Sequence, residues 1–307
     1  MGGSAPPLER SYRVGPVELS GLECGPPRSP RGVVIALHGS GYLSRYWDYP
    51  ADPAASLLRQ GRALGYRVIA VDRPGYGRSR AADAETACLD SQARILADLI
   101  AQVRRESRPA PVFLIGHSLG SLLAVRLAAG EAAANVAGLD VTGLPVRWRT
   151  DIRAAVESDA DGFGSSLHDT RRRLALFYGP AGTYDQRMVM AETKFTHRIP
   201  PIEMRDSLGS PQILRALAPK VRVPVQSTVA EHENVIVGGR QSVTVNRALF
   251  SSSSRSVARW QPRAGHNVSL HHVAGEYHAR ALAFFDEFRS RLRPDDPDAE
   301  PSLEAAL

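Results

Sequence analysis

The chain has 307 residues, 43% of them hydrophobic and 23% charged, which is typical of a globular protein, and no apolar run approaches the roughly 18 residues of a membrane span. The net charge of +6 comes from arginine, because Lys194 and Lys220 are the only lysines, and no basic run carries the interleaved aromatic residues that bind single-stranded nucleic acid. The two cysteines, Cys24 and Cys88, form no metal-ligand cluster, so we expect no metal, no cofactor, no membrane contact and no nucleic-acid partner.

Both ends of the chain are polar and contain proline. We therefore expect residues 1–10 to fray and residues 294–307 to form a disordered tail. The first residues also lack the apolar centre of a signal peptide, which predicts a cytoplasmic protein.

Short β-branched apolar runs, most of them ending in glycine or proline, predict buried strands. They occur at 33–39, in the segment 66–79, and at 111–116, 135–143, 223–231 and, more weakly, 253–261. Apolar residues at helical spacing predict helices at 89–106, 121–130 and 276–293. Strands that alternate with helices indicate an α/β fold, with a mostly parallel sheet covered by helices on both faces.

The alternation stops between residues 145 and 218. This stretch has no clear buried strand, and short helical pieces alternate there with glycine and proline. We interpret it as a helical cap, or lid, inserted into a core made of residues 1–144 and 219–293.

The segment Gly116-His117-Ser118-Leu119-Gly120 joins a predicted strand to a predicted helix. A serine in this position stands on a sharp turn, and the flanking glycines lack the Cβ atoms that would collide there. The next backbone N–H, that of Leu119, lies at the start of the helix and points into the same space. This context indicates a nucleophilic serine, with the histidine beside it supporting the turn.

Together with this pentapeptide, two further turns resemble those of the α/β-hydrolase superfamily. "ALHGSG" (36–41) is similar to the family's His-Gly turn, whose backbone supplies a second donor to an oxyanion; by position this is the Ser40 N–H, with that of Gly41 next. "DRPGYGRS" (72–79) is similar to the turn that follows the next strand in these proteins. The resemblance implies the α/β-hydrolase fold.

The late part of the chain carries the rest of the resemblance. Glu233 follows the strand after which the family places its acid, although aspartate is usual there, and "RAGHNVSL" matches the loop that supplies the base, His266. The order serine, acid, histidine is the one that this fold requires. The resemblance therefore implies a Ser118–His266–Glu233 triad. Asp140, which ends the preceding strand, stays open as an alternative acid.

Such a triad implies an enzyme: a serine hydrolase that cleaves a carboxylic ester or thioester through an acyl-enzyme. Lactonases, amidases and aminopeptidases share the triad, and an acyltransferase or cyclase would pass the same acyl group to an alcohol or amine. A non-catalytic ligand-binding protein is a further alternative. The arginine- and alanine-rich composition and the unmatched cap favour secondary metabolism, with a small-molecule acyl substrate that a carrier protein could deliver. The oligomeric state is not indicated.

The acyl pocket is expected to lie under the cap. Aromatic side chains of the cap and of the segment after residue 41 are candidates to line it: Tyr42, Trp47, Phe163, Phe177 and Tyr178.

Overall fold

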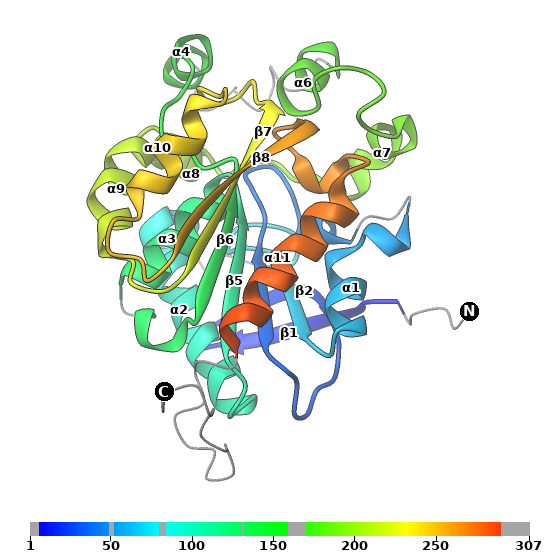
Figure 1. The fold of residues 1–307 in the computed structure, drawn as a ribbon, viewed down its shortest axis with the longest axis vertical. Coiled ribbons are helices and arrows are strands. Elements are labelled where there is room, and N and C mark those ends of the chain that lie inside the picture. Colours follow the sequence, from blue (N-terminus) through cyan, green and yellow to red (C-terminus); the bar gives the residue numbers. More distant parts are fainter. Residues whose placement is uncertain (1–5, 49–51, 80–83, 131, 159–169, 290–307) are drawn as a thin grey trace, which may run out of the picture.

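The computed structural model describes residues 6–48, 52–79, 84–130, 132–158 and 170–289. An eight-stranded sheet runs through the molecule in the order β1-β2-β4-β3-β5-β6-β7-β8 (Figure 1). The strands are β1 (Leu8–Val14), β2 (Val17–Cys24), β3 (Val33–Leu37), β4 (Arg67–Val71), β5 (Val112–His117), β6 (Gly138–Thr142), β7 (Val225–His232) and β8 (Ser256–Gly265). β2 pairs antiparallel with β1 and β4, and all other neighbours are parallel.

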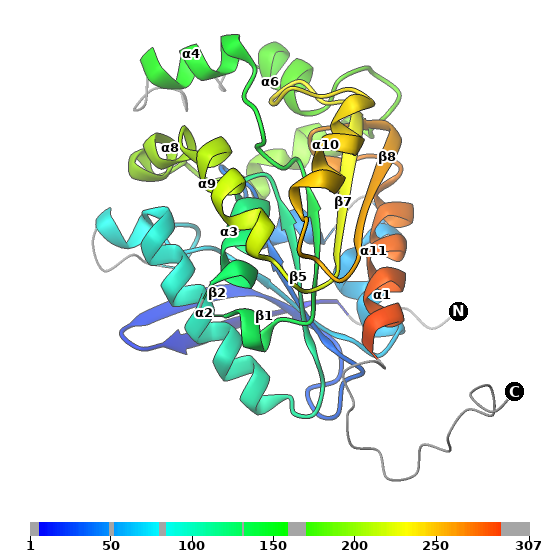
Figure 2. The ribbon, with the colours of Figure 1, turned by 60° about the vertical axis from the view of Figure 1, so that its left-hand side comes forward.

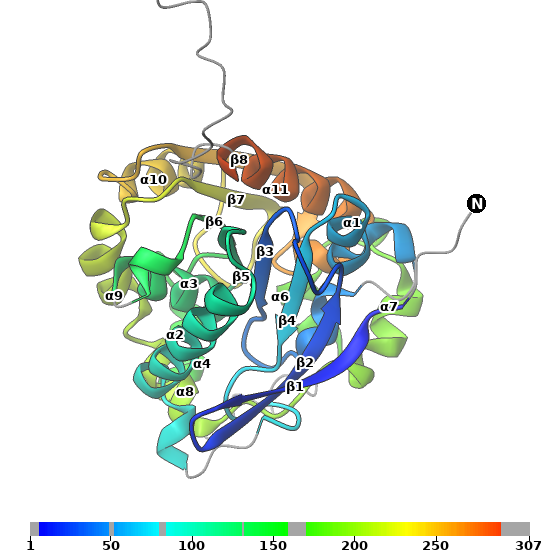
Figure 3. The ribbon, with the colours of Figure 1, turned by 90° about the horizontal axis from the view of Figure 1, so that it is seen from below.

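Helices cover both faces of the sheet, as seen from below in Figure 3. The helices are α1 (Leu57–Ala63), α2 (Leu89–Glu106), α3 (Leu119–Ala129), α4 (Thr150–Ser158), α6 (Thr170–Phe177), α7 (Gln186–Ala191), α8 (Pro201–Ser207), α9 (Ser210–Leu217), α10 (Gln241–Leu249) and α11 (Ala274–Arg289). α2, α3 and α9 pack on one face, and α1 and α11 pack on the other. No helix in the described ranges combines the length and the apolar character that crossing a membrane requires. The predicted α/β fold is confirmed.

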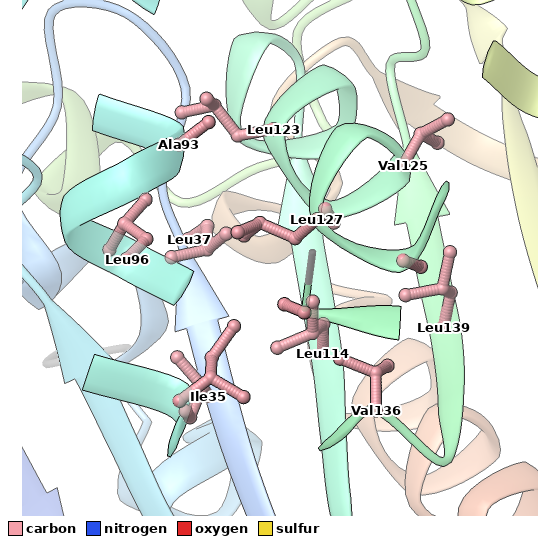
Figure 4. Packing of buried hydrophobic residues seen from close by; sticks show 14 of the residues in the cluster. Ile35, Leu37, Ala93, Leu96, Leu114, Leu123, Val125, Leu127, Val136 and Leu139 are labelled. Atoms are coloured by element: carbon pink, nitrogen blue, oxygen red, sulfur yellow. The ribbon is translucent and has the colours of Figure 1, made fainter. Parts of the chain in front are cut away.

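Burial in the core explains why the central strands could be predicted from the sequence. Every residue of β3, β4 and β5 is buried, because helices cover both faces, and so these strands are near-continuous apolar runs. In Figure 4, Leu37 of β3 lies close to Leu96 of α2, and Leu123 of α3 packs in the same cluster. α2 has the predicted bounds, and its first turn is capped by the Cys88 thiol, which accepts the Ser91 N–H.

The N-terminal hairpin was not predicted. Residues 8–10, expected to fray, begin β1, which lies at the edge of the sheet. Within β1 only Tyr12 and Val14 are buried, so the strand shows no apolar run that a sequence pattern could detect. The turn between β1 and β2 contains Gly15, whose φ of 57° suits a residue without a side chain.

The described part of the segment 145–218 contributes helices α4, α6, α7, α8 and α9 and adds no strand to the sheet. α4 and α6 lie beyond the carboxyl ends of β7 and β8 (Figures 1 and 2). Side chains of α4, α6 and α8 form a small buried cluster with the loop that follows β7. α9 differs, because its Leu214 packs in the main core with Leu123 and Val125 of α3.

Candidate active site

Ser118 stands on the turn between β5 and α3. Its φ of 54° and ψ of −120° are strained for a residue with a side chain. The end of β6 fastens this turn: the Thr142 carbonyl accepts the Ser118 N–H at 2.9 Å and the Ser121 hydroxyl at 2.7 Å. Hydrogen bonds from neighbouring residues therefore keep Ser118 in this strained conformation.

The two glycines that flank Ser118 are there for the predicted steric reason. A Cβ atom on Gly120 would lie 2.1 Å from the carbonyl oxygen of Leu37, and one on Gly116 would lie 2.6 Å from the carbonyl oxygen of Gly120. Glycine at 120 thus lets the start of α3 approach the end of β3. Glycine at 116 lets the chain close the turn.

His266 and Glu233 form a buried pair on the loops after β8 and β7. His266 Nδ1 lies 2.9 Å from Oε1 and 2.8 Å from Oε2 of Glu233, and the two side chains are 1% and 2% exposed. Oε1 also accepts the backbone N–H groups of Val235, at 2.9 Å, and Ile236, at 3.3 Å. A carboxylate on Nδ1 keeps the proton on that nitrogen, which leaves Nε2 able to accept one.

His117, next to the serine, supports the loop that carries His266. Its Nε2 lies 3.0 Å from the His266 carbonyl oxygen, which can only accept, so Nε2 carries the proton. The ring stacks on Tyr46 with 4.6 Å between ring centroids. Burial holds the pKa of His117 well below its ordinary value, so the ring stays neutral.

Two of the three residues expected to donate to an oxyanion line the same cavity as Ser118. Leu119 and Ser40 both line the cavity that contains Ser118, and no other group in the described part of the chain accepts their N–H groups. The third expected donor, Gly41, is placed differently, because its N–H points to the Tyr76 hydroxyl at 3.4 Å. Leu119 and Ser40 therefore differ from Gly41 in having backbone N–H groups that are not engaged with another described residue.

A cavity of about 40 Å³ lies over Ser118. Ser40, Ser118, Leu119 and His266 line it on the side of the sheet. Its remaining walls are mostly apolar and come from the end of β5, from α4, α6 and α8, and from nearby loops: Tyr42, His117, Trp148, Ile152, Val156, Leu176, Phe177, Ile199, Met204, Ser207 and Val235. Nowhere in the described ranges do three His, Cys, Asp or Glu side chains lie together as metal ligands.

Residues 34–282 match the sequence model of the α/β hydrolase family. The chain belongs to this family. It is 37% identical over 123 residues to esterase Rv0045c of Mycobacterium tuberculosis, an alignment that covers 40% of this chain and 36% of that protein. It is 28% identical over 107 residues to mouse protein phosphatase methylesterase 1, covering 35% of this chain and 26% of that protein. The chain thus spans about a quarter to a third of the length of these curated relatives.

A carboxyl esterase from Bacillus coagulans shares the fold of this α/β hydrolase. The two structures superpose with a TM-score of 0.70 over 93% of this chain and 99% of that one, at 19% sequence identity. At this identity the likeness concerns the fold, and the chemistry has to be argued from the site.

Of the residues expected to line the pocket of the α/β hydrolase, Tyr42 and Phe177 do so. Trp47 and Tyr178 do not, because both rings are fully buried away from the cavity: Trp47 packs edge-on against Tyr46, and Tyr178 packs against Tyr184. Phe163 lies outside the described residues. The sequence reasoning missed the walls made by Trp148, Ile152, Val156 and Met204, although the four-residue spacing of Ile152 and Val156 marks one helix face.

Asp140, the alternative acid, lies in the core. Tyr277 Oη donates to its Oδ1 at 2.8 Å, and Gln226 Nε2 donates to its Oδ2 at 2.7 Å. Complete burial raises the pKa of Asp140 to about 6. The structure therefore places Glu233, and not Asp140, beside His266.

A buried ion pair, which the sequence reasoning did not find, underlies Ser40. Glu203 of α8 accepts the Ser40 hydroxyl at 2.7 Å and the Tyr76 hydroxyl at 2.6 Å, and it pairs with Arg73 at 2.7 Å. Arg73 and Glu203 are both 0% exposed. Although burial opposes ionisation, the Arg73 guanidinium holds the pKa of Glu203 below its usual value. Gln92 completes the network, donating to Glu203 at 2.6 Å.

Proposed function

We propose that this α/β hydrolase cleaves a carboxylic ester or thioester through an acyl-enzyme on Ser118. One observation carries the proposal: Ser118 and His266 line the same cavity, and Oε2 of Glu233 lies 2.8 Å from Nδ1 of His266, which leaves Nε2 for the serine. A serine hydroxyl attacks a carbonyl only when a base takes its proton, and this arrangement supplies the base with a partner that fixes its tautomer.

In the proposed reaction, His266 Nε2 accepts the Ser118 proton as Oγ attacks the carbonyl carbon. The N–H groups of Leu119 and Ser40 then bind the oxyanion, an interaction typically worth about 3–4 kcal/mol for each donor. His266 returns the proton to the leaving alcohol or thiol, and the acyl group stays on Ser118. Water, deprotonated by His266, attacks the acyl carbonyl; the bond to Ser118 Oγ then breaks, His266 returns the proton to that oxygen, and the carboxylic acid leaves.

The walls of the cavity indicate the class of substrate. A space of about 40 Å³ between apolar side chains holds little more than a short acyl group, so we assign a small-molecule substrate with a short apolar acyl chain. The helical segment from about residue 145 to α8 acts as the cap in this proposal. α9 belongs to the core, since it packs on α3.

Labelling with a fluorophosphonate, read by intact mass, tests the proposal. Wild type should gain one adduct, and Ser118→Ala and His266→Ala should gain none. Ser252→Ala, which changes an exposed serine, should label like wild type. Lack of an adduct on wild type, or an adduct that persists on Ser118→Ala, would overturn the mechanism. Hydrolysis of p-nitrophenyl esters, lactones and acyl-thioesters then identifies the bond that is cleaved.

The apolar lining also favours a second candidate, acyl transfer, because a cavity that holds little water lets an alcohol or amine compete for the acyl-enzyme. A carrier-bound acyl chain of secondary metabolism would be a suitable donor. Product analysis with added alcohol separates the two functions: hydrolysis gives the free acid, and transfer gives the new ester as the main product.

A further inference from the structure

A second and larger cavity lies beside the first. Its volume is about 370 Å³, within the usual range of small-molecule sites. α9 and α10, which lie on the same side of β7 in Figures 1 and 2, flank it. A backbone bridge between Trp148 and Ile236 lies between the two cavities: Trp148 lines the first and Ile236 lines the second.

Two buried polar side chains face this second cavity without a partner. The Thr228 hydroxyl, on a residue 1% exposed, has no hydrogen-bond partner among the described residues. Asn246 of α10 is 5% exposed, and the structure gives its side chain no hydrogen bond to any described residue. A fully buried polar atom left unpaired is costly, so the Thr228 hydroxyl favours a ligand with a hydrogen-bonding group, and the less deeply buried Asn246 amide can form a second hydrogen bond.

Two arginines line the same cavity and are exposed to solvent. Neither Arg147 nor Arg215 makes an ion pair in the described part of the chain, whereas most of the other arginines that line a described cavity or the core are paired. Glu233 is the one carboxylate among the described lining residues, and both of its oxygens lie within hydrogen-bond distance of His266 Nδ1. The mouth of the cavity is therefore positively charged.

An apolar surface completes the lining. It comes from Leu144, Val146, Val229, Ile236, Val237, Val245 and Leu249. Val245 is 46% exposed, which makes it one of four large hydrophobic side chains left on the surface of the described chain. A ligand that covers this surface gains from burying apolar area, by roughly 25 cal/mol for each Å².

We propose that this second cavity binds a small amphipathic carboxylate. Its carboxylate pairs with Arg147 and Arg215, its aliphatic chain covers the apolar lining, and a distal hydroxyl or amide bonds with Thr228 and Asn246. The charge, the unpaired polar groups and the apolar surface each select one part of this ligand. The cavity borders the arrangement proposed for Ser118, because Glu233 belongs to both, but binding to the cavity requires no turnover.

Calorimetric titration with 8-hydroxyoctanoate, octanoate and octan-1-ol tests the proposal. Wild type should bind the hydroxy acid most tightly and the uncharged alcohol most weakly. The double variant Arg147→Gln, Arg215→Gln should weaken both acids at least tenfold, since charge-assisted hydrogen bonds are lost. Thr228→Val, which keeps the shape and removes the hydroxyl, should reduce the affinity for the hydroxy acid to that for octanoate. Arg247→Gln, which changes an exposed arginine of α10 outside the lining, is the matched control.

Two results would contradict the proposal. One is the absence of binding by either acid at millimolar concentration. The other is binding that the double arginine variant leaves unchanged, which would place the acid elsewhere, for instance in the cavity over Ser118. Both arginines are exposed, so the double variant is expected to fold even if Thr228→Val does not.

Discussion

The two halves of the candidate site are held in different ways. On the base side, backbone groups hold the parts: the N–H groups after Glu233 fix its carboxylate, and the carbonyl of His266 accepts His117 at 3.0 Å. On the oxyanion side, Ser40 depends on a buried ion pair, and one member of that pair, Glu203, comes from α8.

This difference matters because a substitution can remove one member of a buried ion pair, whereas it leaves backbone hydrogen-bonding groups in place. The loops that carry His266 and Glu233 are joined to the helical segment by backbone hydrogen bonds, such as the one from the Asn267 N–H to the Phe177 carbonyl at 3.0 Å. The oxyanion side needs the charge on α8, and breaking a buried pair by removing one member leaves an uncompensated charge, at a cost of about 3–5 kcal/mol. Substitutions in α8 should therefore perturb Ser40 more than they perturb His266.

The base side can be broken at the acid. Glu233→Gln should lower kcat by about ten-thousandfold, because the amide no longer stabilises the imidazolium or fixes its tautomer. Asp140→Asn, the matched change at the buried carboxylate that was the alternative acid, should stay within about tenfold of wild type, as expected for a residue that does not contact His266. Ester hydrolysis measured under saturating substrate decides between them. A larger loss at Asp140 would reverse the assignment.

The oxyanion side can be broken at Glu203. Glu203→Gln leaves Arg73 buried without a counter-charge, and we expect about 3–5 kcal/mol less stability in urea unfolding. We also expect kcat to fall about 10- to 100-fold with little change in KM, since an oxyanion contact acts in the transition state.

Glu23→Gln is the control for this prediction. Glu23 pairs with Arg67 at 3.1 Å, and Arg67 begins β4 at the opposite end of the sheet from the candidate site. This variant should lose stability and keep its kcat. Equal losses of kcat in both variants would show that unfolding alone explains the effect.

The core beneath the base side can be examined through pH. Burial raises the pKa of Asp140 to about 6, so the folded state keeps a proton that the unfolded state releases near pH 4. The contribution of Asp140 to stability is full below about pH 4 and is lost as the pH rises through about 6, by up to roughly 3 kcal/mol. The difference in unfolding free energy between wild type and Asp140→Asn should therefore shift against wild type from pH 4 to pH 8. A difference that is constant with pH would contradict the raised pKa.

The smallest expected effect concerns the acyl-chain preference set by the cavity over Ser118. Val156→Ala and Met204→Ala should widen it and shift the preference toward longer acyl chains, with up to about 1–3 kcal/mol in kcat/KM for each methylene that becomes accommodated. A p-nitrophenyl series from acetate to octanoate measures the shift. Met190→Ala, at a methionine that is 82% exposed, should leave the preference unchanged.

The central strands and the candidate site residues that follow them could be predicted from the sequence. Strands buried on both faces are apolar runs, and in this fold the catalytic candidates follow strand ends, so their positions were visible. The edge strand β1 has no such run. The pairing of Arg73 with Glu203 joins residues 130 positions apart, and no local pattern records it. Trp47 lies in a segment near the site, but the sequence does not show that its ring turns into the core.

The contacts that complete the site also order its assembly. Ser40 meets Glu203 across 163 positions, His117 meets His266 across 149, and Tyr42 meets Asn267 across 225. During synthesis the proposed nucleophile emerges long before its base, its acid and the helix that steadies Ser40. A partly synthesised chain should therefore lack catalytic activity. After dilution from denaturant, the recovery of catalysis would report when the contacts between the most distant parts of the polypeptide have formed.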